Sequence, residues 1–120
     1  MLIIFFTKLN MKKKFLKISN DLIKNSIDNG PLAFIFRTKI HAIIVFNIYG
    51  SEKITFENLC RNLDSVASRT TIQTILIEGV KKNYLTKEVD NADKRKKYYN
   101  CINLKDTLND WYKNNKIIFN

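Results

Sequence analysis

Charged side chains crowd together in one segment that is predicted to be a loop. Lys94-Arg95-Lys96-Lys97 places four cations in a row, and Asp90 and Asp93 lie just before them. Cations on a loop can straddle a phosphate backbone, and a guanidinium suits the negative potential of a narrow DNA minor groove. A loop that needed only positive charge would have no use for aspartates, so we expect Asp90 and Asp93 to orient Arg95. The alternative is a charge cluster that only aids solubility.

A second group of polar side chains lies on a helix that is predicted to begin after Ser68. Its members are Ser68, Arg69, Thr70, Thr71, Gln73, Thr74 and Lys81, opposite an apolar stripe of Ile72, Ile75, Leu76 and Val80. Hydroxyls, an amide and cations bind base edges or phosphates, and no acid occurs in this segment before Glu78. The alternative is an ordinary solvated helix face. Ile77, near the exposed side, suits either a thymine methyl group or packing.

Residues that could support catalysis or metal binding are scarce. The chain has one histidine, His41, and two cysteines, Cys60 and Cys101, whose separation matches no zinc or redox motif. We expect both cysteines to be buried thiols in a reducing compartment, with a Cys60–Cys101 disulfide or a site shared with His41 as alternatives. No nucleophile–base pair, paired-carboxylate site or phosphate-binding loop can be assembled. We therefore expect no enzymatic activity, cofactor or metal.

The composition is that of one globular domain with a large excess of positive charge. The 120 residues include 21 Lys and Arg against 11 Asp and Glu, a formal net charge of +10, and 45% are hydrophobic. This favours a packed core and a polyanionic partner, with nucleic acid first and an anionic membrane surface second. Only four residues are arginines. They are more informative than the lysines, whose number an AT-rich coding sequence would also raise.

The apolar segments favour a cytoplasmic protein without a membrane partner. Residues 2–6 have no basic segment before them and no small-residue cleavage site after them. The longest later apolar run, residues 42–46, is far shorter than the ~20 residues of a spanning helix. A peripheral membrane protein that uses Lys12-Lys13-Lys14 is a further alternative, but residues 2–6 would anchor it weakly. Met1 and Met11 are both candidates for the natural start.

Apolar spacing and helix-stop residues divide the chain, taken as one domain over 1–120, into helices and one hairpin. Asn29-Gly30-Pro31 is predicted to end the first helix through a left-handed glycine cap. Lys53–Thr55 suits a very short strand, and Thr55 and Ser68 are predicted N-caps. The predicted elements are an N-terminal helix over 11–30, a central helix over 32–50, a helix-turn-helix over 55–83, a hairpin over 84–102 and a C-terminal helix over 104–119.

Four short motifs lie between Phe56 and Ile102: Leu59-Cys60-Arg61-Asn62-Leu63, Ala67-Ser68-Arg69-Thr70-Thr71-Ile72, Lys82-Asn83-Tyr84-Leu85 and Asp90-x-x-Asp93-x-Arg95. In these motifs the chain resembles the MarR-type winged-helix transcriptional regulators, and the last motif matches the wing signature of that family. The resemblance implies a mainly α fold with a small β-hairpin wing, a winged helix-turn-helix with flanking N- and C-terminal dimerisation helices. The sequence departs from the family at Gly79, at Asn83, at Cys101-Ile102-Asn103 and in a longer turn between the two helices.

The resemblance also implies sequence-specific binding of double-stranded DNA by a homodimer. Ser68, Arg69, Thr70, Thr71, Gln73 and Thr74 fall where the family contacts the major groove, and Arg95, with Asp93 as its partner, falls on the minor-groove arginine. The dimer would use the flanking helices, including Trp111, Tyr112, Ile117, Ile118 and Phe119; packing within one chain is the alternative. A small-molecule effector is compatible with the family, but no residue here indicates a ligand. The alternative function is a winged-helix protein-interaction or assembly module in a nucleoprotein complex.

Overall fold

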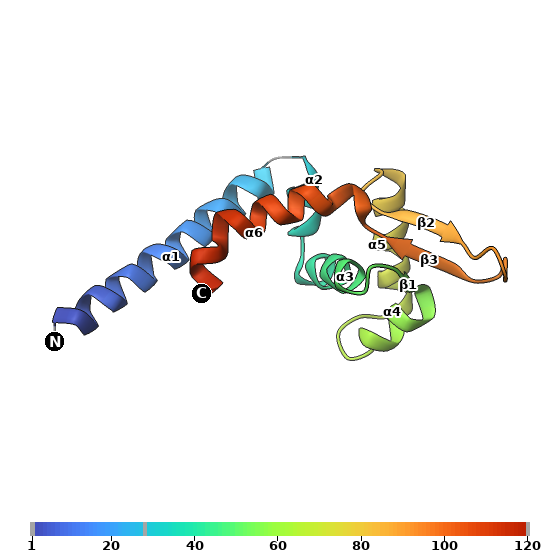
Figure 1. Ribbon diagram of the computed structural model, residues 1–120, viewed down its shortest axis with the longest axis horizontal. Helices are drawn as coiled ribbons and strands as arrows, with labels where there is room; N and C mark the ends of the chain where they lie inside the picture. Colours follow the sequence, from blue (N-terminus) through green and yellow to red (C-terminus); the bar gives the residue numbers. More distant parts are fainter. Residues whose placement is uncertain (1, 28, 120) are drawn as a thin grey trace.

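The computed structural model describes the backbone of residues 2–27 and 29–119 and the side chains of residues 10–27 and 29–115. It is mainly helical, with a small three-stranded antiparallel sheet (Figure 1). The elements are α1 (Leu2–Ile27), α2 (Pro31–Ile35), α3 (Lys39–Gly50), β1 (Ile54–Thr55), α4 (Phe56–Asn62), α5 (Arg69–Lys81), β2 (Thr86–Val89), β3 (Lys97–Asn100), the 3-10 helix η1 (Ile102–Leu104) and α6 (Lys105–Phe119).

Helix α1 is longer at its start and shorter at its end than predicted. It begins at Leu2 and not at Met11, because no proline or glycine interrupts the residues before Met11. It ends at Ile27, and the predicted left-handed glycine cap at Gly30 is wrong. Gly30 has an extended backbone (φ −82°, ψ −172°) and is the N-cap of α2, with Pro31 as the first helical residue.

The predicted central helix is two helices, which is a second correction. Residues 36–38 separate α2 from α3, and Thr38 has an extended backbone (φ −140°, ψ 165°). The Thr38 side chain accepts a hydrogen bond from the backbone N–H of His41 at 3.2 Å, so it caps α3. Apolar residues continue on both sides of this cap, so the apolar pattern predicts one continuous helix.

The predicted helix pair and its caps are confirmed. Thr55 accepts from the N–H of Asn58 at 3.2 Å at the start of α4, and Ser68 accepts from the N–H of Thr71 at 3.1 Å at the start of α5. Ile72, Ile75 and Leu76 are buried as expected, whereas Val80 is only partly buried and Gly79 is buried beside it. Asn83 is left-handed (φ 63°), as its position after α5 predicts.

The predicted hairpin is confirmed and joins a third strand. The sheet order is β1-β3-β2, with Val89 opposite Lys97 and Ile54 opposite Tyr99. The strands are shorter than the predicted hairpin over 84–102, since β2 begins at Thr86 and β3 ends at Asn100. The N–H groups of Tyr84 and Leu85 are bound to the carbonyl of Gly79, and Ile102 already begins η1.

The core lies where α2 to α5, the sheet and the start of α6 meet. Its fully buried side chains are Phe34, Ile35, Ile44, Val45, Ile48, Leu59, Leu63, Ile72, Leu76, Leu85 and Leu104. Cys60 and Cys101 are buried and free, so the alternative of a disulfide between them is wrong. Helices α1 and α6 run side by side away from this core (Figure 1), and Lys17 Nζ donates to the carbonyl of Asn114 at 2.6 Å.

Candidate nucleic-acid interface

The outward side of α5 carries the polar side chains that the sequence singled out. Ser68, Arg69, Thr70, Gln73, Thr74 and Lys81 are exposed, and Thr71 is partly buried. They share this side with Ile77, which is also exposed. The helix faces the core with Ile72, Ile75, Leu76 and Gly79, so its polar side remains accessible to a partner.

Three of the hydroxyls on α5 are used inside the protein. The Ser68 hydroxyl donates to the Thr71 hydroxyl oxygen at 3.0 Å while it accepts from the Thr71 N–H. The Thr74 hydroxyl donates to the carbonyl of Thr70 at 2.9 Å. Ser68 and Thr71 therefore fix the start of the helix. The amide of Gln73, on the same side of α5, is carried on a longer side chain than these hydroxyls.

Arg69 is held by a carboxylate that the sequence prediction missed. Its two terminal nitrogens donate to the two oxygens of Glu57, at 3.0 and 2.7 Å, and its guanidinium lies 5.0 Å from the centre of the Phe56 ring. Hydrogen bonding between the two groups lowers the pKa of Glu57 and raises that of Arg69. This paired, two-bond geometry orients the guanidinium and places a negative charge beside it. A glutamate at the second position of α4 was the available sequence signal.

The tip of the β2–β3 hairpin is organised by its two aspartates. Asp93 Oδ1 accepts from the backbone N–H of Arg95 at 3.0 Å and from its Nε at 3.4 Å. Asp90 does not contact Arg95; its carboxylate accepts from the N–H of Ala92 at 2.9 Å and so shapes the turn. The Asp90 part of the orienting prediction is therefore corrected, because its oxygen binds the backbone and not the guanidinium.

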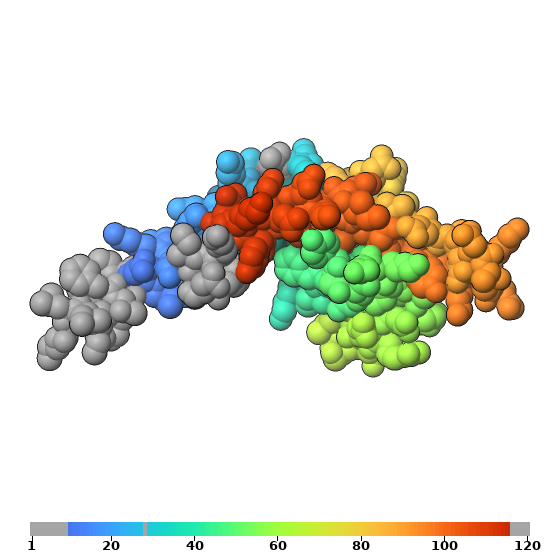
Figure 2. Space-filling view, in the orientation of Figure 1, coloured from blue at the N-terminus to red at the C-terminus, as the bar shows by residue number. Residues whose placement is uncertain are grey.

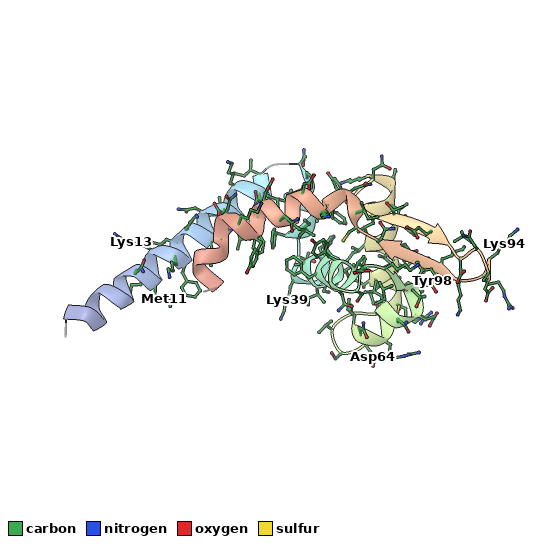
Figure 3. The ribbon with its side chains drawn as sticks, viewed as in Figure 1. Met11, Lys13, Lys39, Asp64, Lys94 and Tyr98 are labelled. Atoms are coloured by element: carbon green, nitrogen blue, oxygen red, sulfur yellow. The ribbon has the colours of Figure 1, made fainter. Side chains whose placement is uncertain are left out.

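The cations of the hairpin tip point into solvent. The side chain of Arg95 is 94% exposed, and Lys94, Lys96 and Lys97 are exposed too. Lys94 lies at the end of the molecule opposite to Met11 and Lys13 of α1 (Figure 3). Backbone hydrogen bonds from Asp90 to Lys96 and from Lys96 to Asp93, both 2.9 Å, close the loop that carries these charges.

The hairpin is coupled to α5 at its root. The Gly79 carbonyl accepts from the N–H of Tyr84 at 2.9 Å and from that of Leu85 at 3.0 Å. Leu85 is fully buried, and its side chain packs against the site where Gly79 has no side chain. The polar side of α5 and the basic hairpin therefore belong to one packed unit.

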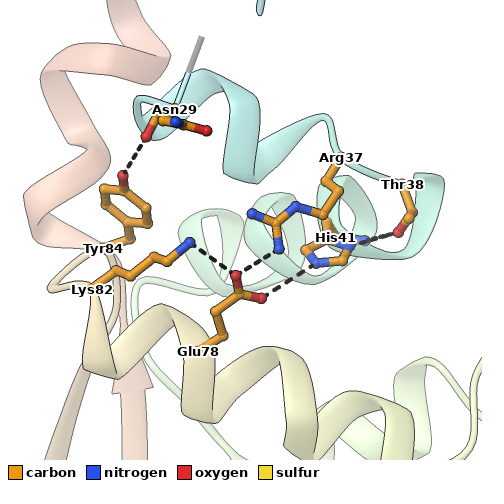
Figure 4. Close-up of polar contacts among 7 residues, drawn as sticks. All are labelled: Asn29, Arg37, Thr38, His41, Glu78, Lys82 and Tyr84. Atoms are coloured by element: carbon orange, nitrogen blue, oxygen red, sulfur yellow. Dashed lines mark hydrogen bonds and ion pairs between the residues drawn. The ribbon is translucent and has the colours of Figure 1, made fainter. Parts of the chain in front are cut away.

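The sequence analysis also did not predict a charged cluster around Glu78 of α5 (Figure 4). Glu78 Oε1 accepts from Arg37 at 2.6 Å and from Lys82 at 3.0 Å, and its Oε2 lies 4.0 Å from His41 Nε2. The hydrogen bonds from Arg37 and Lys82 lower the pKa of Glu78. Burial, reinforced by Arg37, lowers the pKa of His41. The cluster ties the connection between α2 and α3, and the start of α3, to the end of α5.

The remaining features of the described residues bear on metal binding, thiol chemistry and membranes. The described residues contain no group of three or more His, Cys, Asp or Glu side chains placed to hold a metal ion. A cavity of about 790 Å³ is lined by Tyr49, Lys53, Glu88, Cys101 and Lys105, among others. Burial raises the pKa of the Cys101 thiol to about 11, so it stays protonated at neutral pH and is a poor nucleophile. None of the described helices combines the length and apolar character needed to cross a membrane.

Comparison of the chain with protein-family models, with curated proteins and with solved structures finds no match. The features that bear on function are therefore a helix pair, a polar helix face and a hairpin with a basic tip in which Asp93 binds Arg95.

Proposed function

We propose that the chain is a sequence-specific double-stranded DNA-binding protein, a MarR-like transcriptional regulator. In this proposal α5 enters the major groove as a recognition helix, and the β2–β3 hairpin is a wing that reaches the minor groove. The observation that carries the proposal is the hairpin tip, where Asp93 accepts from the backbone N–H and from Nε of Arg95, whose side chain is 94% exposed among exposed lysines. A guanidinium presented at such a tip suits a narrow groove of strongly negative potential.

The structure of α5 supports the same proposal. Its exposed side includes the Thr70 hydroxyl, the Gln73 amide and the Lys81 ammonium, groups of the kinds that hydrogen-bond base edges and phosphates. The bonds from the Gly79 carbonyl to the start of the hairpin would hold helix and wing in a constant relation. Such a relation is needed if one rigid unit is to bind two neighbouring grooves.

The proposed regulator acts as a homodimer through α1 and α6. Apolar side chains along α1, among them Phe15, Ile23 and Ile27, are strongly exposed in the single chain. A monomer rarely exposes so many large apolar side chains along one helix without a partner. Trp111 instead packs against Phe36 at 5.1 Å between ring centres, within the chain. The side chains of Ile117, Ile118 and Phe119 lie outside the described residues.

The test measures binding to random-sequence duplex DNA by fluorescence anisotropy at low and high salt. The wild type is compared with an Arg95→Ala/Lys96→Ala variant. We expect tight, salt-sensitive binding by the wild type. The variant should bind more weakly and lose about one unit of salt slope for each phosphate contact removed.

A matched control separates the wing from the overall charge. Lys12→Ala/Lys13→Ala removes the same number of exposed cations from α1, at the other end of the molecule (Figure 3). We expect this variant to keep nearly all of the wild-type affinity. Equal losses in both double variants would assign binding to net charge alone, and absence of binding would reject the proposal.

The alternative, a winged-helix module that binds a protein in a nucleoprotein complex, has one observation in its favour. Ile77 is a large apolar side chain exposed in the middle of α5. An apolar contact surface would suit a protein partner better than DNA. Its polar neighbours Gln73 and Lys81 favour DNA, and the salt-dependence experiment decides between the two functions.

A further inference from the structure

We propose that Ile77 reads the 5-methyl group of thymine in the major groove and so helps to select the DNA sequence. This inference rests on the proposed function, since it assigns a role within the same interface. It names a specificity-determining residue and a base that this residue recognises.

Ile77 lies on the outward side of α5 and contributes little to the core. It is 59% exposed, whereas Ile75 and Leu76, its neighbours along the chain, are buried. It follows Gln73 and Thr74 by four and three residues and precedes Lys81 by four, the spacing of one helix face. The groove that accepts Gln73 and Lys81 must therefore also accommodate Ile77.

The chemistry of this face narrows what Ile77 can contact. The Thr74 hydroxyl donates to the Thr70 carbonyl. The exposed side chains one helical turn from Ile77, Gln73 and Lys81, offer an amide and a cation. In the major groove every base edge presents hydrogen-bond donors or acceptors, and thymine adds a methyl group beside its O4 acceptor. An isoleucine side chain has no polar atom, so the thymine methyl is the base-edge group that it matches.

A protein partner fits this face less well. Protein interfaces place apolar side chains in a core depleted of charge. Ile77 instead lies one helical turn from exposed Lys81 and from the Gln73 amide. A single apolar side chain within a polar and cationic stripe suits DNA, because a thymine methyl group in the groove is flanked by polar groups.

The experiment first selects duplexes from a random-sequence library with the wild-type protein. A selected duplex is then synthesised with thymine and again with 2′-deoxyuridine, which lacks only the methyl group. Dissociation constants are measured for the wild type, for Ile77→Ala and for the control Ile102→Ala. Ile102 is 68% exposed and lies on η1, outside α5. Circular dichroism checks the fold, which we expect to be retained because alanine favours helix at an exposed position.

We expect loss of the methyl groups to weaken binding of the wild type and of Ile102→Ala by about fourfold for each methyl contacted. Ile77→Ala should bind thymine DNA more weakly and should be nearly indifferent to the replacement. An equal loss in Ile77→Ala and wild type would overturn the inference while DNA binding stands, as would a wild type indifferent to the methyl groups. If the wild type binds no duplex, the proposed function fails and the inference fails with it.

Discussion

In the proposed DNA interface, Arg69 is a residue whose charge a single carboxylate modulates. Its guanidinium is bound by both oxygens of Glu57, so a negative charge lies beside the positive charge at the start of α5. We expect Glu57→Gln to raise affinity for random-sequence DNA and to steepen the salt dependence by about one unit, because Arg69 becomes available to a phosphate. Anisotropy titrations over a salt series check this.

The control for this prediction is Asp110→Asn, which makes the same change of charge on an exposed residue of α6. If Asp110→Asn raises affinity as much as Glu57→Gln, the effect is one of net charge. If Glu57→Gln lowers affinity, Glu57 orients Arg69 for binding and does not restrain it.

His41 gives the protein a pH-dependent stability. Its side chain is buried, its Nδ1 lies 2.6 Å from the Thr38 hydroxyl oxygen, and burial and then Arg37 lower its pKa, against the opposing charge of Glu78. The folded state therefore prefers the neutral ring. The contribution of His41 is complete above the ordinary pKa of 6.5 and is lost as the pH falls through that value toward the folded-state pKa.

We expect the free energy of unfolding to decrease between pH 7.5 and 5.5, by at most about 1.4 kcal/mol per pH unit from this residue. Urea unfolding of the wild type and of His41→Gln at both pH values measures it. The variant should show a shallower decrease. The same decrease in both proteins would assign the pH dependence to other groups.

At the residue scale, short-range contacts could be predicted and long-range contacts could not. Asp93 and Arg95 are two residues apart, so one turn brings them together and the sequence suffices. The partners Glu57 and Arg69 are separated by 12 residues, and Arg37 and Glu78 by 41. These pairs form only when the elements that carry them pack together. Local sequence patterns do not predict how those elements pack.

At the scale of elements, Gly79 determines how α5 packs. A side chain there would place its Cβ 2.5 Å from Leu85 Cδ1 and 3.2 Å from Phe34 Cζ, both in the core. We expect Gly79→Ala to destabilise the protein by about 1–3 kcal/mol, because the clash outweighs the gain of up to about 1 kcal/mol in helix propensity. Urea unfolding checks it.

Gly50→Ala is the matched control, since a Cβ at Gly50 meets nothing within 4 Å. If Gly79→Ala is as stable as the wild type, Leu85 can move away from the new methyl group on α5 with little loss in free energy of unfolding. In that case the hairpin is not rigidly coupled to the helix.

The elements also show which signals a sequence carries well. The helix pair and hairpin were predictable because Thr55, Ser68 and Asn83 mark their ends with polar or left-handed residues. The break at Thr38 was not, because its capping role depends on a single hydroxyl between apolar segments. The very short strand predicted at Lys53–Thr55 is confirmed as β1, which is only two residues long (Ile54–Thr55) and is stabilised by its pairing with β3.

At the scale of the whole molecule, the chain is more extended than a compact domain. Its radius of gyration is 17.2 Å and it measures 62 × 27 × 24 Å, whereas a compact chain of this length has a radius of about 14 Å. Figure 2 shows the arm of α1 and α6 projecting from the rest of the molecule. In a monomer the apolar side chains of this arm are exposed to water, which is unfavourable. A second copy of the chain would bury them.

The dimer in the proposed function predicts how substitutions on this arm behave. Phe15 is 61% exposed in the single chain, so Phe15→Glu should leave the fold unchanged while it places a charge in the dimer interface. We expect sedimentation velocity to show a dimer for the wild type and for Asn20→Glu, an exposed polar position on the same helix, and a shift toward monomer for Phe15→Glu. Phe15→Glu should also lower the affinity for duplex DNA, because a monomer contacts only one half-site. A wild type that sediments as a monomer at all concentrations would contradict the prediction and would leave α1 to another partner.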